Sequence, residues 1–191
     1  MSDDAVEHAR ALFEALGLDS EEDPEVAETP ERFTGFLREM YAGLDEEPPS
    51  MSAFGSEYAE GSDQAEPVVL TALPFYSMCV HHVVPFFGTI DVGYVPDEQM
   101  TGFGSVGRVI DHFSRRPQVQ ERLVNQIADH IDEQLEPRGV LVRCRARQLC
   151  MEMRGPEKTG TLIATAARGV LTDETRRARL LETFAREQET P

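Results

Sequence analysis

Apolar residues recur at helical spacing in two stretches near the start of the chain. In residues 4–17 they are followed by Gly17, and in residues 29–43 they follow Thr29 and Pro30. Thr29 suits a helix N-cap and Pro30 suits the first helical position. We therefore predict two N-terminal helices, whose apolar faces consist of Ala5, Ala9, Leu12, Phe13 and Leu16 in the first and Phe33, Phe36, Leu37 and Met40 in the second.

The next segment, residues 45–66, has no such period. It is rich in proline, glycine, serine and acidic residues, a composition typical of loops and linkers. We therefore expect the chain to divide into an N-terminal helical region with its linker, residues 1–66, and a main domain, residues 67–191.

The pattern changes after Pro67. Short runs rich in Val, Ile and Leu predict strands, and two longer stretches with four-residue apolar spacing predict helices, the second opening at Pro117. The fold class is thus α+β, with a four-stranded sheet and two helices on one face. The uncovered face favours assembly into an oligomer. The strands are expected at 67–78, 86–95, 139–152 and 160–171, and the helices at 104–114 and 117–136.

The formal net charge of −17 is concentrated in one part of the chain. Residues 1–66 hold 19 acidic residues against three arginines, whereas residues 67–191 are close to neutral. This acidic field repels polyanions, so nucleic acid is excluded as a partner. No run approaches the roughly 18 apolar residues of a membrane span. The acidic, amphipathic start does not resemble a secretory signal, so we expect a cytoplasmic protein.

The densest chemistry lies in Cys79-Val80-His81-His82. The spacing of Cys79 and His82 lets one turn present a thiolate and an imidazole to one ion, and Cys150 offers a third soft ligand. Two cysteines and one histidine leave an open position on zinc, where a bound water has a pKa of about 7. From spacing alone, a zinc site and ordinary core or surface positions are equally good interpretations. Cys144, about 20 Å before Cys150 along an extended strand, is not expected to be a ligand.

Three segments together resemble the signature blocks of the GTP cyclohydrolase I family. They are FYSMCVHHVVPFFG at 75–88, FSRRPQVQERL at 113–123 and LCMEMRG at 149–155, and the similarity runs from about Thr29 to Phe184. The resemblance implies the tunnelling fold, with an antiparallel sheet and two helices. It also implies a toroidal homo-oligomer, a decamer in that family.

The same resemblance implies a site and a reaction. Zn²⁺ would bind Cys79, His82 and Cys150, and its water would attack C8 of the guanine ring of GTP. Formate and 7,8-dihydroneopterin triphosphate would be the products. His81 would be an acid/base group, which suits an imidazole with a pKa near neutrality. Glu121 would hold the guanine edge at the start of a helix, where the dipole favours a carboxylate.

Other residues that match the family pattern would also bind the substrate. Gln120 lies beside Glu121, and arginines suit the triphosphate because their planar fork donates two hydrogen bonds. The matching arginines are Arg32, Arg108 and Arg154. Arg32, in the TPERF segment, would reach the site of a neighbouring subunit.

The sequence departs from the family pattern at four positions. Val80 replaces a glutamate, and Gly104-Ser105 replaces a Ser-Lys pair, so Ser105 would face the phosphates without a positive charge. A lost charge-assisted contact is worth about 1.5–3 kcal/mol. Gln148 replaces a second catalytic histidine; two residues before Cys150 on a strand, it would still point at the pocket. Glutamine forms hydrogen bonds but cannot shuttle protons.

These departures leave several functions open. The enzyme could stop at the ring-opened formamidopyrimidine, or use a guanine substrate with fewer phosphates. It could also be a regulatory paralogue that binds a guanine nucleotide without catalysis. The nitrile reductase branch of the fold is disfavoured by the zinc triad and the QER segment. The pathway served stays open between folate, tetrahydropterin and deazapurine synthesis.

Overall fold

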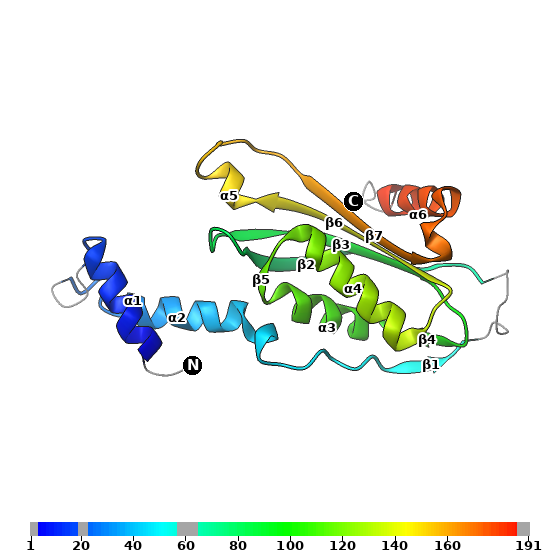
Figure 1. The fold of residues 1–191 in the computed structure, drawn as a ribbon, viewed down its shortest axis with the longest axis horizontal. Coiled ribbons are helices and arrows are strands. Elements are labelled where there is room, and N and C mark those ends of the chain that lie inside the picture. Colours follow the sequence, from blue (N-terminus) through cyan, green and yellow to red (C-terminus); the bar gives the residue numbers. More distant parts are fainter. Residues whose placement is uncertain (1–3, 19–22, 57–64, 187–191) are drawn as a thin grey trace.

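The computed structural model describes residues 4–18, 23–56 and 65–186. Its centre is a sheet in the strand order β5-β2-β3-β6-β7, seen in Figure 1. The four long strands pair antiparallel with their neighbours, and the two-residue strand β5 pairs parallel with β2. The strands are β2 (Val68–Cys79), β3 (Pro85–Val95), β5 (Pro117–Gln118), β6 (Gly139–Gln148) and β7 (Leu162–Gly169). The mixed α+β class with an antiparallel sheet is therefore confirmed.

Helices α3 (Phe103–Ser114) and α4 (Gln120–Leu135) lie on one face of this sheet. Alternate residues of β6 point toward them, because side chains two apart on a strand share a face. Val140, Val142 and Cys144 are 0% exposed and belong to the main apolar core. The predicted placement of two helices on one face is thus found in the structure.

The predicted start of the second helix is wrong by three residues. Pro117 and Gln118 are extended and pair with Met78 and Cys79 at the end of β2. Gln118 is also buried and donates from its amide to the backbone oxygen of Phe113 at 3.0 Å. These contacts keep the chain extended through Val119, so α4 begins only at Gln120.

The two strands predicted at 139–152 and 160–171 are also shorter than expected. β6 ends at Gln148, and residues Leu149–Glu152 form the short helix α5, so Cys150 lies on a helical turn and not on a strand. β7 ends at Gly169, whose φ of 56° turns the chain into the 3₁₀ helix η2 (Val170–Thr172).

A C-terminal helix that the sequence pattern did not predict, α6 (Glu174–Arg186), packs on the opposite face. Its buried Leu180 and Phe184 form a second core with Val95, Leu141 and Leu171. This helix covers part of the face that was expected to be free for a partner.

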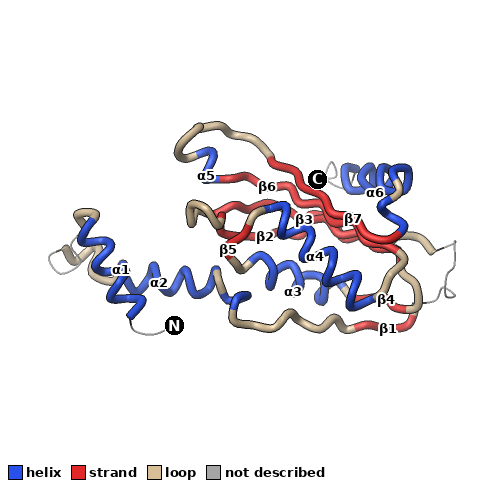
Figure 2. The backbone as a smooth tube through the Cα atoms, viewed as in Figure 1, coloured by secondary structure: helices blue, strands red, loops and turns tan. Residues whose placement is uncertain are grey.

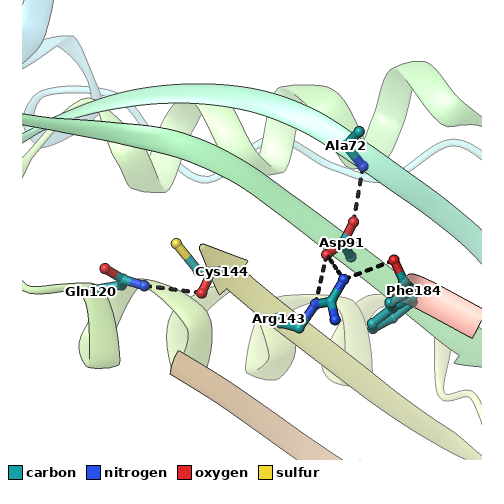
Figure 3. A network of polar contacts seen from close by, with 6 residues as sticks. All are labelled: Ala72, Asp91, Gln120, Arg143, Cys144 and Phe184. Carbon is teal, nitrogen blue, oxygen red and sulfur yellow. Dashed lines mark hydrogen bonds and ion pairs between the residues drawn. The ribbon is translucent and has the colours of Figure 1, made fainter. Parts of the chain in front are cut away.

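A buried ion pair fixes α6 to the sheet (Figure 3). Asp91 on β3 and Arg143 on β6 are opposite each other in the register, and their charged atoms are 2.8 Å apart. Arg143 also donates to the backbone oxygen of Phe184 at 2.9 Å. Asp91 accepts from the N–H of Ala72 at 2.9 Å, where a register shift interrupts β2 and φ is 57°. The polar groups of this cluster therefore satisfy one another.

The N-terminal helices α1 (Asp4–Ala15) and α2 (Thr29–Met40) form a hairpin that projects from the body in Figure 2. The rings of Phe13 and Phe33 meet edge-on at 5.3 Å. Both predicted helices are confirmed, although Glu28, not Thr29, occupies the N-cap position of α2. After α2 the 3₁₀ helix η1 (Ala42–Leu44) approaches α3 so closely that a Cβ on Gly43 would lie 2.1 Å from the oxygen of His112.

The predicted loop at 45–66 contains one short strand. β1 (Ala53–Gly55) pairs with β4 (Gln99–Thr101) in a separate two-stranded sheet. Residues 57–64 of this loop lie outside the described part, and the domain boundary at residue 66 stays a prediction. Among the described residues no helix is both long and apolar enough to cross a membrane.

Candidate metal centre

A tight turn at the end of β2 presents the Cys79-Val80-His81-His82 segment. The N–H of Cys79 donates to the oxygen of Val84 at 3.0 Å, and the N–H of Val83 donates to the oxygen of Cys79 at 2.9 Å. Val83 has a φ of 51°, a left-handed conformation that closes the turn. The side chains of His81 and His82 are consequently exposed beside the buried Cys79.

The sheet register brings Cys150 to this turn. Phe86, just after the turn, is the partner of Gln148 on β6, and α5 follows directly. One ligand atom from each of Cys79, His82 and Cys150 lies within 4.8 Å of the others. The structure thus brings together the three residues predicted as metal ligands. Buried Cys144 lies outside this group in the described residues.

The separation of Cys79 and His82 suits two ligands of one tetrahedral metal ion. Bonds of about 2.0–2.3 Å place neighbouring ligand atoms about 3.3–3.8 Å apart, and the Cys79 Sγ lies 3.8 Å from the His82 Nδ1. Burial, followed by a hydrogen bond that the Cys150 thiol donates to the neighbouring Cys79, raises the pKa of Cys150. A divalent cation would oppose both effects by stabilising the thiolates. The group could therefore hold a metal ion.

His81 lies next to this group without belonging to it. Its Nδ1 is 3.9 Å from the Cys79 Sγ, and its ring meets that of His82 at 70° with the centroids 6.1 Å apart. The imidazole is exposed and adjacent to the three ligands. It is therefore placed where it could contact a molecule bound to the metal.

Gln120 and Gln148 form a hydrogen-bonded pair beside the metal group. Gln120, the first residue of α4, is 2% exposed, and Gln148 ends β6 two residues before Cys150. The Gln148 Nε2 donates to the Gln120 Oε1 at 2.8 Å. The Gln120 Nε2 donates to the backbone oxygens of Cys144 (Figure 3) and Leu162, both at 3.0 Å.

Two charged residues predicted to bind substrate lie near this end of the sheet. Glu121 is exposed in the first turn of α4, where the helix dipole favours a negative charge. Arg154 follows α5, and its positive charge slightly counteracts the raised pKa of Cys150. This end of the sheet thus carries an acidic and a basic side chain besides the three candidate ligands.

Arg32, Ser105 and Arg108 lie elsewhere in the chain. Arg32 is on the projecting helix α2, 74% exposed and paired with Glu28 at 2.6 Å. Ser105 is buried near the start of α3, and its hydroxyl accepts from the Arg108 guanidinium at 3.2 Å. α3 reaches the metal end only at Ser114, nine residues and about 14 Å further along the helix. One chain therefore does not bring all the predicted substrate-binding residues to one place.

Sequence reasoning did not assign the residues that anchor the turn at Cys79–Val83. The N–H of Val80 donates to the backbone oxygen of Gln118 at 2.9 Å. The hydroxyl of Ser77 donates to the backbone oxygen of Ser114 at 2.7 Å. Ser114 is the last residue of α3, and Gln118 lies in β5, in the stretch that was expected to be the start of the second helix. Pro117 was the available signal, since proline is favoured at strand edges as well as at helix starts.

The fold and the metal group define the class as an α+β protein with a candidate metal centre at one end of its sheet. Comparison with known proteins then gives the family. The family model described as GTP cyclohydrolase I matches residues 5–185. The chain therefore belongs to the GTP cyclohydrolase I family, and it is a hydrolase.

Individual relatives agree with this assignment. The chain is 43% identical over 180 residues to GTP cyclohydrolase 1 of Geobacillus kaustophilus (strain HTA426), covering 92% of this chain and 93% of that protein. It is 41% identical over 155 residues to the Helicobacter pylori (strain G27) protein of the same name, covering 81% and 84%. The crystal structure of the archaeosine synthase QueF-Like in the apo form covers 56% of this chain and 97% of its own, with a TM-score of 0.45 and 15% identity, which is a weak likeness.

Proposed function

We propose that this protein is a zinc-dependent GTP cyclohydrolase I, which hydrolyses the guanine ring of GTP at C8 to formate and 7,8-dihydroneopterin triphosphate. The observation that carries the proposal is the Cys79-His82-Cys150 group, whose ligand atoms lie within 4.8 Å of one another in a chain of this family. Cys79, His82 and Cys150 would hold the zinc ion. When bound, zinc supplies an activated water at its fourth position.

The surrounding residues would bind and orient the nucleotide. His81, exposed beside Cys79, would transfer protons to and from the purine. Glu121, in the first turn of α4, would accept hydrogen bonds from the guanine edge. Arg154, whose positive charge acts on Cys150, would pair with a phosphate group. Gln148 stands where the family pattern has a second histidine, and its amide does not titrate. His81 would therefore be the acid/base residue in this mechanism.

The remaining predicted residues support a site completed by a second copy of the chain. Arg32 lies on the projecting hairpin, and Arg108 lies in the first half of α3, bonded to Ser105 near the helix start and away from the metal group. In a toroidal homo-oligomer with the tunnelling fold, such as the decamer implied by family resemblance, these groups would reach a neighbour's phosphates. Tyr76 is 65% exposed, and its ring stacks on that of Phe87. These two rings offer an apolar surface for that assembly. We place the enzyme in the cytoplasm, where GTP is available.

The test is a time course of the zinc-loaded protein with GTP, with formate and purine products followed by mass spectrometry. We expect formate together with dihydroneopterin triphosphate. The matched control is His81→Ala, which should keep its zinc and lose turnover by about 10²–10⁴-fold.

Three other results would each replace the proposal. A ring-opened formamidopyrimidine would show that the reaction stops early. Turnover only with guanosine or its monophosphate would show a different phosphate preference. Nucleotide binding without any turnover would indicate a regulatory protein.

A further inference from the structure

The amide of Gln120 has one possible orientation. Its nitrogen lies 3.0 Å from two backbone oxygens, those of Cys144 on β6 and Leu162 at the start of β7. A backbone oxygen only accepts hydrogen bonds, so both must face the NH₂ group, which has two hydrogens to donate. The orientation thus follows from the partners and not from a choice between similar atoms.

This orientation fixes the amide of Gln148 as well. The Gln120 Oε1 is the only part of the Gln120 amide left to meet Gln148, and it can only accept. Gln148 must therefore present its nitrogen to Gln120, as it does at 2.8 Å. The Gln148 Oε1 consequently faces away from Gln120.

The pair is held firmly and lies beside the reacting groups. Gln120 is 2% exposed and tied to two strands, so it has no free donor with which to bind a ligand. Gln148 is half-buried and two residues from the metal-binding Cys150, while Gln120 directly precedes Glu121. The hydrogen-bonded pair therefore connects the metal group to the start of α4.

We propose that Gln148 presents its carbonyl oxygen to the substrate as a fixed hydrogen-bond acceptor, and that Gln120 is a positioning residue that holds this orientation without touching the substrate. This rests on the proposed function above. The preferred ligand group is an N–H or O–H donor of the guanine nucleotide near the metal. An acceptor at the same place, such as a ring carbonyl, would be repelled.

Substitutions at Gln148 test which atom faces the substrate. Gln148→Met keeps the length and removes the acceptor, so kcat/KM for GTP should fall about three- to tenfold, the effect of one hydrogen bond. Gln148→Lys can donate to Gln120 but offers no acceptor, so it should be at least as impaired as Gln148→Met. Recovery of parental kcat/KM by Gln148→Lys, or no change in Gln148→Met, would overturn the proposal.

A double-mutant cycle tests the positioning role of Gln120. In the parent background, Gln120→Met should lower kcat/KM. In the Gln148→Met background the same substitution should lower it by less than about twofold, because Gln120 acts through Gln148. Equal losses in both backgrounds would mean that Gln120 contacts the substrate itself. The melting temperature of each variant reports its folding separately, and the Gln148 variants decide the case if Gln120→Met does not fold.

The parent protein is assayed first, so that the two proposals fail separately. A parent that releases no formate from GTP overturns the proposed function. The same variants are then compared by the dissociation constant of GTP from calorimetry, where Gln148→Met and Gln148→Lys should both bind more weakly. If the parent is active and the variants bind GTP with the parental dissociation constant, only the proposed role of Gln148 is rejected.

Discussion

The two ends of the central sheet use polar residues in opposite ways. At the α6 end, Asp91 and Arg143 are buried and pair with each other, and they also bond to the Ala72 N–H and the Phe184 oxygen. At the other end, the donor atoms of Cys79, His82 and Cys150 turn toward one another within 4.8 Å. The first arrangement is complete and stabilises the fold. The second gathers soft ligands around a point that a cation can occupy.

Removing one of the three candidate ligands tests this difference between the two ends most directly. Cys150→Ser should lose bound zinc and reduce formate release from GTP by at least about a hundredfold, because the open metal position depends on all three ligands. Metal content by atomic emission and formate release give the measurement. The matched control is Cys144→Ser at a buried thiol outside the metal group, which should keep its zinc. Full zinc and activity in Cys150→Ser would remove Cys150 from the site.

Breaking the complete arrangement should instead affect stability. Arg143→Met leaves Asp91 buried without its cation, which costs about 3–5 kcal/mol in the free energy of unfolding. Urea denaturation of the assembled protein measures this loss. Arg145→Met, two residues along the same strand on the same face and half-buried, is the control and should cost much less. An equal decrease in the free energy of unfolding in the two variants would mean that the Asp91–Arg143 ion pair does not stabilise the fold more than an ordinary strand residue does.

The smallest of these three effects is expected at Glu121, near the end of the sheet that carries Cys79, His82 and Cys150. Glu121→Gln keeps the shape of the side chain and removes its charge, so GTP should bind about ten- to a hundredfold more weakly. Calorimetric titration with GTP measures the change. Glu133→Gln, exposed on the same helix, is the control and should bind like the parent. Unchanged affinity in Glu121→Gln would exclude this residue from guanine recognition.

Sequence patterns predicted much of this molecule because its elements have clear periods. The four long strands and the four helices α1 to α4 come from apolar spacing, and the metal group comes from the Cys79-x-x-His82 spacing with a distant Cys150. Long-range pairing explains what was missed. Pro117 and Gln118 are extended because β2 is beside them, which no local pattern can show.

Other features depended on contacts that cannot be read locally. α6 has a strongly polar sequence, and only Leu180 and Phe184 are buried, so its helical period was easy to overlook. Gln120 was expected to contact the substrate because it lies in a family motif. Its burial and its bonds to Cys144 and Leu162 depend on how α4 packs on the sheet. Its predicted role as a substrate contact remains a question for the double-mutant cycle.

The spacing of the metal ligands along the chain has a consequence for biosynthesis. His82 and Cys150 are 68 residues apart, and they meet only because β6 pairs with β3 after α3 and α4 have been made. A ribosome-bound chain that ends before residue 150 therefore has no complete cluster to capture an ion. An ion held by all three residues would therefore bind only after this long-range pairing has closed, so the chain would fold through a metal-free stage.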